Sequence, residues 1–233
     1  MNIKKFLGVM LLLTVLALPQ AAFATKTDWF DKKFDFRNLR AVIVFDMTVT
    51  PGVDYGGEIA LRNMQETFRN SARNLKCDII TEAQARQMLS RRLGVDLDQI
   101  AYANPVQARQ VIMQNASQIA DGWIVGNVDN MANTYYIEPA RTVWEQRRST
   151  RTFRDAWGNR QQEEYYVQVP VTYPPRRVDT TSVQVTMQAF EARGGAQIFA
   201  RKDVRDREDY QAQGGMFGRI THSFFEDLAK RMR

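Results

Sequence analysis

The chain has 233 residues, a formal net charge of +6, one histidine and one cysteine. This length is enough for one domain with a full hydrophobic core, or for two small ones. One histidine and one cysteine cannot supply the nitrogen and sulfur ligands of a zinc site, and a lone cysteine forms no internal disulfide. The composition therefore argues against a histidine-based metal centre, and we expect no cofactor.

The first 24 residues have the pattern of a cleaved secretory signal peptide. A basic segment with two lysines precedes an apolar run from Phe6 to Leu18, and a small-residue A-F-A triplet ends at Ala24. The apolar run is shorter than the roughly 20 residues that span a bilayer. We predict a mature chain that begins at Thr25, lies in the periplasm or outside the cell, and has no transmembrane segment. An uncleaved membrane anchor is the alternative.

The charge of the mature chain bears on its partners. The predicted leader holds two lysines and no acid, so the net charge of +6 falls to +4 in the mature chain. Affinity for a phosphate backbone depends on several clustered cations that meet an accessible polymer. We therefore expect no nucleic-acid partner.

The first half of the mature chain alternates apolar strands with amphipathic helices. After a polar lead-in from Thr27 to Leu39, strands are predicted within 40–49, 77–80 and 122–128. The first helix has an apolar stripe at Leu61, Met64, Phe68, Ala72 and Leu75. A capping box at Thr81 and Gln84 opens a second helix, which Gly94 ends. This order predicts an α/β fold in which helices cover a mixed sheet.

The second half changes to the period of two that β-strands have. One predicted strand has Tyr165, Val167, Val169, Val171 and Tyr173 on one face. A later hairpin turns at the Arg193-Gly194-Gly195 sequence, and a terminal helix has a stripe formed by Phe217, Ile220, Phe224 and Leu228. We predict one α/β domain over residues 25–233, with an arginine-rich β-hairpin inserted at about 141–173.

The order of these elements resembles that of periplasmic envelope-assembly domains. An "AVIVFD" strand, a long helix, an "ADGWIVGNV" segment, a "VTMQAFEARGGAQIFARKD" hairpin and a closing amphipathic helix follow one another. This order is similar to the TolB amino-terminal domain, the CsgG-like curli secretion channel family and the lipoprotein activators of peptidoglycan synthases. The resemblance covers most of 40–232 and implies function through protein contacts and oligomers rather than catalysis. Unlike many members, the chain has no lipoprotein cysteine after its leader.

Catalytic residues are hard to find in the sequence. The single histidine, His222, lies near the edge of the terminal helix stripe, so we expect a half-buried structural side chain. Asp96 and Asp98, and the "KDVRDRED" segment with Asp203 and Asp206, lack the spacing of a calcium loop. We interpret that segment as a solvated loop of mixed charge. The alternative is a carboxylate-dependent enzyme or small-ligand-binding protein that uses these acids.

A glycine-rich segment also precedes the first predicted helix. Its "GVDYGGE" sequence is typical of a helix amino terminus that binds an anion, but it lacks a phosphate-loop lysine. We expect no ligand at this position.

The arginine-rich stretch is the most unusual part of the chain. It is predicted to be a β-arm between Arg141 and Tyr173 that turns near Gly158 and Asn159. Arginines occur on both faces of its first strand, and an arginine at the bilayer midplane costs roughly 2–4 kcal/mol, which argues against a membrane hairpin. Two interpretations remain: a charged arm that protects a sheet edge, or a contact arm.

We predict that the protein is a non-enzymatic, exported cell-envelope protein that acts as a binding, scaffold or assembly subunit. A homo-oligomer is expected, together with envelope protein partners. Arginine and aromatic side chains are enriched where interfaces bind most strongly. The predicted partner-binding residues are Arg147, Arg148, Arg151, Arg154, Trp157, Tyr165 and Tyr166.

Overall fold

The computed structural model describes residues 24–208 and 213–233. The predicted leader therefore lies outside the described residues, apart from Ala24. The chain divides into two compact units. We call them the body, which is formed by the residues up to Asn133 and from Thr180 onward, and the ribbon, which is Thr134–Asp179.

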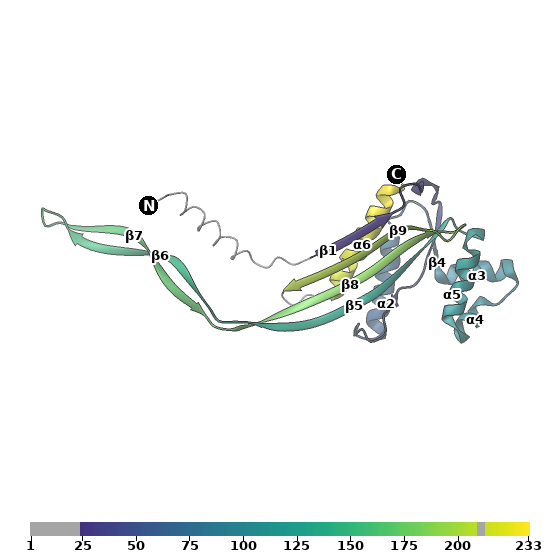
Figure 1. Ribbon diagram of the computed structural model, residues 1–233, viewed down its shortest axis with the longest axis horizontal. Helices are drawn as coiled ribbons and strands as arrows, with labels where there is room; N and C mark the ends of the chain where they lie inside the picture. Colours follow the sequence, from purple (N-terminus) through teal and green to yellow (C-terminus); the bar gives the residue numbers. More distant parts are fainter. Residues whose placement is uncertain (1–23, 209–212) are drawn as a thin grey trace. The chain divides into compact units, whose positions relative to one another are not determined.

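A mixed sheet of seven strands, counted over the described residues, organises the body. Its order is β1-β9-β8-β5-β2-β4, and β3 pairs with β5 (Figure 1). The parallel pairs are β2 with β4, β2 with β5 and β3 with β5, whereas β9 pairs antiparallel with β1 and with β8. The predicted mixed sheet is confirmed. The strands are β1 (Ala24–Phe30), β2 (Ala41–Val44), β3 (Thr48–Val49), β4 (Asp78–Thr81), β5 (Gly122–Glu138), β8 (Arg176–Glu191) and β9 (Gln197–Glu208).

Two long helices, α2 (Glu58–Ala72) and α6 (Gln213–Arg231), cover one face of this sheet (Figure 1). Their apolar stripes face the inward side chains of β2, β5, β8 and β9, because residues three and four apart lie on one side of a helix. The rings of Phe68 and Phe225 lie 5.0 Å apart between the two helices. Both predicted stripes are confirmed.

Three shorter helices cover the other face beside β2. They are α3 (Glu82–Leu93), α4 (Leu97–Ala103) and α5 (Pro105–Asn115), and short 3-10 turns occupy Phe36–Asn38 and Ala116–Gln118. Val42 and Val44 join the core under α2 and α6, whereas Ile43 and Phe45 join the core under α3 to α5. Such burial on both faces is typical of parallel strands. The predicted Thr81 capping box is also present.

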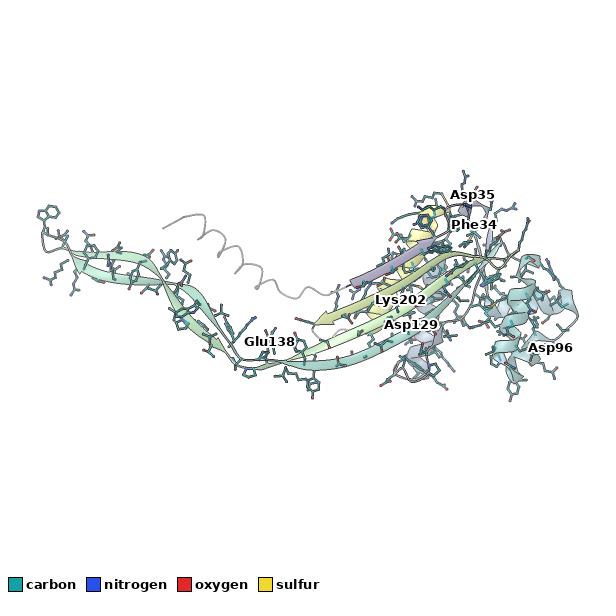
Figure 2. All side chains as sticks on the ribbon, in the orientation of Figure 1. Phe34, Asp35, Asp96, Asp129, Glu138 and Lys202 are labelled. Atoms are coloured by element: carbon teal, nitrogen blue, oxygen red, sulfur yellow. The ribbon has the colours of Figure 1, made fainter. Side chains whose placement is uncertain are left out.

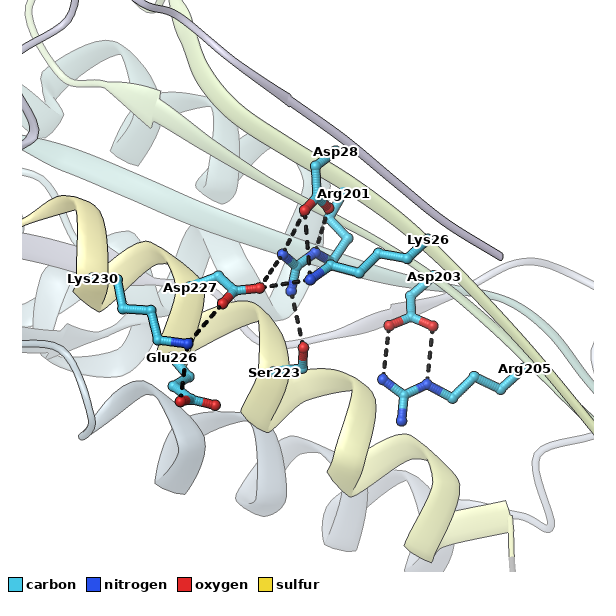
Figure 3. A network of polar contacts seen from close by, with 9 residues as sticks. All are labelled: Lys26, Asp28, Arg201, Asp203, Arg205, Ser223, Glu226, Asp227 and Lys230. Atoms are coloured by element: carbon cyan, nitrogen blue, oxygen red, sulfur yellow. Dashed lines mark hydrogen bonds and ion pairs between the residues drawn. The ribbon is translucent and has the colours of Figure 1, made fainter. Parts of the chain in front are cut away.

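The lead-in contains a strand, which the sequence analysis missed. β1 pairs antiparallel with β9 along its whole length, with Asp28 opposite Arg201. The Arg201 side chain is 0 % exposed, and it donates to Asp28 at 2.6 and 2.8 Å and to Asp227 of α6 at 2.8 Å (Figure 3). The sequence does not indicate β1, because its residues are mostly polar. Their role becomes clear only from the contact of Asp28 with the buried Arg201.

The two carboxylates around Arg201 are held in their ionised form. Burial raises the pKa of Asp28, but hydrogen bonds and charge from Arg201 and Lys26 outweigh it, so the pKa lies below its usual value. Burial likewise opposes the shift at Asp227, whose pKa is lowered by hydrogen bonds from Lys26, Arg201 and Lys230. These groups attach β1 to α6 as well as to β9.

The acidic segment after β8 is also a strand and not the solvated loop that we predicted. β9 continues through Glu208, and Asp203 is 1 % exposed. Its carboxylate accepts two hydrogen bonds, both 3.0 Å, from Arg205 (Figure 3). A segment of mixed charge suggests an exposed loop, because charged side chains are rarely buried unless they are paired. Only the fold shows that Asp203 is paired.

The ribbon contains the predicted hairpin. β6 (Arg141–Arg154) and β7 (Arg160–Tyr173) pair antiparallel from Arg141 with Tyr173 to Arg154 with Arg160. At the turn, Asp155 accepts hydrogen bonds from the backbone N–H groups of Trp157 and Asn159 at 3.0 and 2.9 Å. Gly158 has a φ of 86°, which L-residues rarely adopt. No helix within residues 24–208 and 213–233 is both long and apolar enough to cross a bilayer.

Candidate protein-binding ribbon

Most of the exposed large hydrophobic side chains of the described chain lie in the ribbon. Within Thr134–Asp179, all of which the structure describes, only Val178 is buried. The same segment supplies ten of the fifteen exposed large hydrophobic side chains of the described chain. They are Tyr135, Tyr136, Ile137, Val143, Trp144, Phe153, Trp157, Tyr165, Tyr166 and Tyr173. Such a concentration of exposed apolar groups typically marks an interaction site.

The β6–β7 register sorts these side chains onto two faces, because residues directly opposite each other share a face. One face, which we call the valine face, has rows that pair Val143 with Val171 and that contain the half-buried Val167 and Val169. The rows are Arg141/Tyr173, Val143/Val171, Glu145/Val169, Arg147/Val167, Ser149/Tyr165, Arg151/Glu163 and Phe153/Gln161.

The opposite face, which we call the polar face, has a different composition. Its rows are Thr142/Thr172, Trp144/Pro170, Gln146/Gln168, Arg148/Tyr166, Thr150/Glu164, Thr152/Gln162 and Arg154/Arg160. Thr142 and Thr172 are hydrogen-bonded through their hydroxyl groups at 3.1 Å, and Arg148 forms an ion pair with Glu164. Hydroxyl, amide and charged groups dominate this face, as on the solvated side of a two-stranded sheet.

Charges on the valine face are already paired within the chain. Arg151 donates to Glu163 across the strands at 2.7 Å, and Arg147 donates to Glu145 at 3.4 Å. Glu145 also accepts a hydrogen bond from the Tyr173 hydroxyl, which lowers the pKa of Glu145 and raises that of Tyr173. Exposed ion pairs are screened by water and contribute little to stability, so these groups matter more for the charge pattern of the face than for the stability of the ribbon.

Further pairs order the base of the ribbon. The Arg177 guanidinium lies 4.1 Å from the centre of the Tyr135 ring. Glu138, at the end of β5, pairs with Arg176 and with Arg141, the latter at 3.3 Å (Figure 2). The hydrogen bond from Arg176 is the main reason why the pKa of Glu138 is lowered. The ribbon thus starts before the predicted hairpin, among residues that the sequence analysis did not select.

The seven predicted contact residues all lie in the ribbon, but they occupy three surfaces. Arg147, Arg151 and Tyr165 belong to the valine face. Arg148, Arg154 and Tyr166 belong to the polar face, and Trp157 is 86 % exposed at the turn. A single flat partner therefore cannot contact all seven.

The sequence does not show how the valines of the two strands combine. The alternation of Val167, Val169 and Val171 was visible, but their pairing with Val143 depends on the register of the hairpin. Because a shift by one residue would move every side chain of a strand to the other face, only the paired structure defines the valine face.

The acids that an enzyme or ligand-binding site could use do not meet. Asp96 caps α4, and Asp98 pairs with Arg86 at 2.7 Å. Both line a shallow hollow of about 520 Å³ to which neither Asp203 nor Asp206 contributes. Figure 2 shows Asp96 beside α4, whereas Lys202, next to Asp203, lies on β9. Over the described ranges, no three His, Cys, Asp or Glu side chains are grouped as metal ligands would be.

The histidine also differs from our expectation. His222 is exposed rather than half-buried, and its Nδ1 lies 3.2 Å from Nδ2 of Asn74. The helical periodicity placed His222 at the edge of the apolar stripe of α6. The side chain is exposed because α2, which ends at Ala72, does not cover it.

The glycine-rich segment before α2 places an acid beside one of its own backbone N–H donors. The adjoining hollow of about 550 Å³ is lined by Gly52, Gly56 and Asp54, among others. Asp54 accepts a hydrogen bond from the Gly56 N–H at 3.1 Å, so its carboxylate competes with an anion for this backbone donor.

One charged cluster in the body was not anticipated. Glu82, at the start of α3, accepts hydrogen bonds from Nη2 of Arg109 at 2.6 Å and from the backbone N–H of Asp46 at 3.0 Å. Arg109 also donates to the Asp46 carbonyl oxygen at 3.1 Å. Burial is the largest reason why the pKa of the Asp46 carboxyl is raised. The cluster links the segment that follows β2 to α3 and α5, so its evident role is to join these parts of the body.

No protein family and no curated protein matches the sequence. Among solved structures, the chain is similar to the PelC dodecamer from Paraburkholderia phytofirmans, with 10 % identity and a TM-score of 0.45 over 89 % of this chain and 98 % of that chain. It is also similar to lipoprotein GNA1162 from Neisseria meningitidis, with 11 % identity and a TM-score of 0.38 over 82 % and 98 % of the two chains. At these values neither similarity indicates what this chain binds. The resemblance to the TolB, CsgG-like and synthase-activator group stays a prediction.

Proposed function

We propose that this protein is an exported, non-enzymatic binding or scaffold subunit of the cell envelope, and that the ribbon is its contact surface. The observation that carries the proposal is the combination of a folded body with a ribbon that has almost no buried side chains and most of the exposed large hydrophobic ones. A lone two-stranded hairpin is marginally stable in water, so contact with another chain would stabilise the ribbon as well as the complex.

The chemistry of the ribbon favours a protein partner. Arginine, tyrosine and tryptophan are the residues that contribute most to protein interfaces. Trp144, Trp157 and Tyr166 are exposed, and Tyr166 lies directly opposite Arg148 in the hairpin. A membrane-inserted hairpin would instead need one continuous apolar face, and arginines lie on both faces of β6.

The proposed location rests on the sequence. The tripartite leader would export the chain, after which β1 would begin at the new amino terminus. We propose no catalytic role, because Asp96 caps α4, whereas Asp98 and Asp203 pair with arginines. Partner binding is then the activity that remains to be measured.

The test replaces residues 141–173 by a short Gly-Ser turn in the mature chain. The body has its own core, so the variant should keep its helical circular dichroism signal, and its unfolding free energy should stay within about 0.5 kcal/mol of the parent. Sedimentation velocity should detect the loss of self-association, and pull-down from envelope extracts should detect the loss of partner proteins. A matched control is Tyr102→Ser, which removes a 95 % exposed aromatic group from α4 of the body.

Two results distinguish a contact ribbon from a charged arm that only protects a sheet edge. If the ribbon deletion abolishes association while Tyr102→Ser does not, the contact role is supported. If the deletion leaves both the oligomer and the captured proteins unchanged, the ribbon is only a charged arm and the proposed function is wrong.

A further inference from the structure

We infer that the valine face binds the valine face of a second copy of this chain, with the two ribbons stacked in the same direction about a two-fold axis that runs along them. This inference rests on the proposed contact role of the ribbon and adds the partner, the face and the register. In this arrangement β6 of one copy lies over β7 of the other, row against identical row.

The apolar rows favour binding of a second copy of the same face. Val167, Val169 and Val171 form a continuous aliphatic line along β7 and are half-buried only by their own hairpin. No other described element of the ribbon unit covers them, since β6 and β7 form a sheet of two strands. Stacking a second identical face would remove these side chains and Val143 from water, which is the main favourable term in association.

The charged rows fit a copy of the same face. Within one chain, Arg151 lies opposite Glu163, and Arg141 lies opposite Tyr173 with 5.8 Å between the guanidinium carbon and the ring centre. The two-fold axis places β6 of one copy over β7 of the other, row by row. Arg151 therefore also faces Glu163 of the second copy, and Arg141 also faces its Tyr173. Val143 then faces Val171 of the second copy. Three rows are therefore self-complementary, namely Arg141/Tyr173, Val143/Val171 and Arg151/Glu163. Glu145 and Arg147, which pair with each other within one chain, would lie over Val169 and Val167 of the second copy.

The opposite direction is less favourable. If the turn of one ribbon lay over the base of the other about the central row, β6 would lie over β6, and Arg147 would face Arg147 of the second copy. Like charges directly opposite each other destabilise a pairing. The charge pattern thus selects the arrangement in which both ribbons point the same way.

Shape and area set the expected strength. Two-stranded ribbons twist strongly, and identical ribbons twist equally, so they can coil around each other. Strands of 14 residues are about 46 Å long, and a two-stranded face is about 10 Å wide, which gives roughly 900 Å² for the two copies together. This lies just below the roughly 1,200 Å² of stable interfaces. We expect a dimer that dissociates in about the micromolar range.

The test uses charge reversal in the full mature chain. Arg151→Glu and Glu163→Arg each place like charges at the same row of the interface, so each variant alone should dimerise at least about tenfold more weakly than the parent. When the two variants are mixed, every contact between copies at this row joins opposite charges again. Sedimentation velocity of the equimolar mixture should show a heterodimer with an affinity near that of the parent.

The polar face supplies a matched control. Arg148→Glu and Glu164→Arg reverse an equivalent ion pair on the same hairpin, but on the side that faces away from the second copy. Each of these variants should dimerise like the parent, and mixing them should bring no gain. Every variant also brings like charges together within its own hairpin, so the polar-face pair controls for that effect. The helical circular dichroism signal of every variant should match the parent, because the reversed residues lie outside the core of the body.

Three results would overturn the inference. They are a parent that stays monomeric at about 100 µM, valine-face variants that dimerise like the parent, and equal rescue by the polar-face pair, which would indicate general charge attraction. Failure of the proposed function is distinguishable from these results. If the proposed function is wrong, deletion of the whole ribbon leaves both self-association and partner capture unchanged. If only the dimer inference is wrong, the deletion variant still loses its captured partner protein.

Discussion

Replacement of Phe68 tests the arrangement of α2 against the sheet. The ring is 0 % exposed and packs on Phe225 of α6 at 5.0 Å between centres. Its tip lies beside Gly126 of β5, where even a methyl group would come within 3.1 Å of the ring. The side chain therefore fills the space between two helices and the sheet, and Phe68→Ala would leave a cavity that the surrounding backbone cannot easily close.

The expected cost follows from the buried area. A buried aromatic side chain removes roughly 150 Å² or more from water, and about 25 cal/mol per Å² then gives about 4 kcal/mol. Truncation of a fully buried phenylalanine generally costs about 3–5 kcal/mol once the cavity is included. A domain is stable by only about 5–15 kcal/mol, so this loss should be obvious.

Urea unfolding followed by circular dichroism measures the effect. Phe68→Ala should lower the unfolding free energy by about 3–5 kcal/mol, and Phe68→Leu, which keeps most of the volume, should cost clearly less. Glu66→Ala, on the exposed side of the same helix, should stay within about 0.5 kcal/mol of the parent. If Phe68→Ala behaved like Glu66→Ala, the assignment of this helix face to the core would be wrong.

The remaining predictions concern single groups. Burial, with help from neighbouring acids, raises the pKa of Cys77 to about 11, so iodoacetamide should label the native thiol far more slowly at pH 7.5 than the urea-unfolded thiol. The pKa values of Asp28 and Asp227 are lowered in the folded chain, so the stability they provide is complete above about pH 4 and is lost as the pH falls through those lowered values. Urea midpoints should therefore drop between pH 5 and pH 2 more in the parent than in Asp28→Asn, and an equal drop would contradict the role given to Arg201. Amino-terminal sequencing of the exported protein should begin at Thr25, and a soluble cytoplasmic chain that begins at Met1 would refute the predicted address.

The sequence by itself determined the elements whose signals are local. A helix shows its buried side as residues three and four apart, so the stripe through Phe68 and the stripe through Phe224 both predicted the faces that are buried. Caps are equally local, because the Thr81 side chain and the Gly94 backbone act within one turn of the helix. The order of strands and helices then limited the fold to a mixed, helix-covered sheet.

Tertiary structure decided the features that depend on distant partners. β1 is recognisable as a strand only because Arg201, 173 residues away, is buried against Asp28. Glu82 joins Asp46 to Arg109 across three elements, and nothing in the local sequence of any of them indicates it. The same holds for the valine face. Its composition was visible as alternating valines, but the register of β6 against β7 brings Val143, Arg151 and Glu163 onto that side, and a register is set by pairing between strands rather than by either strand alone.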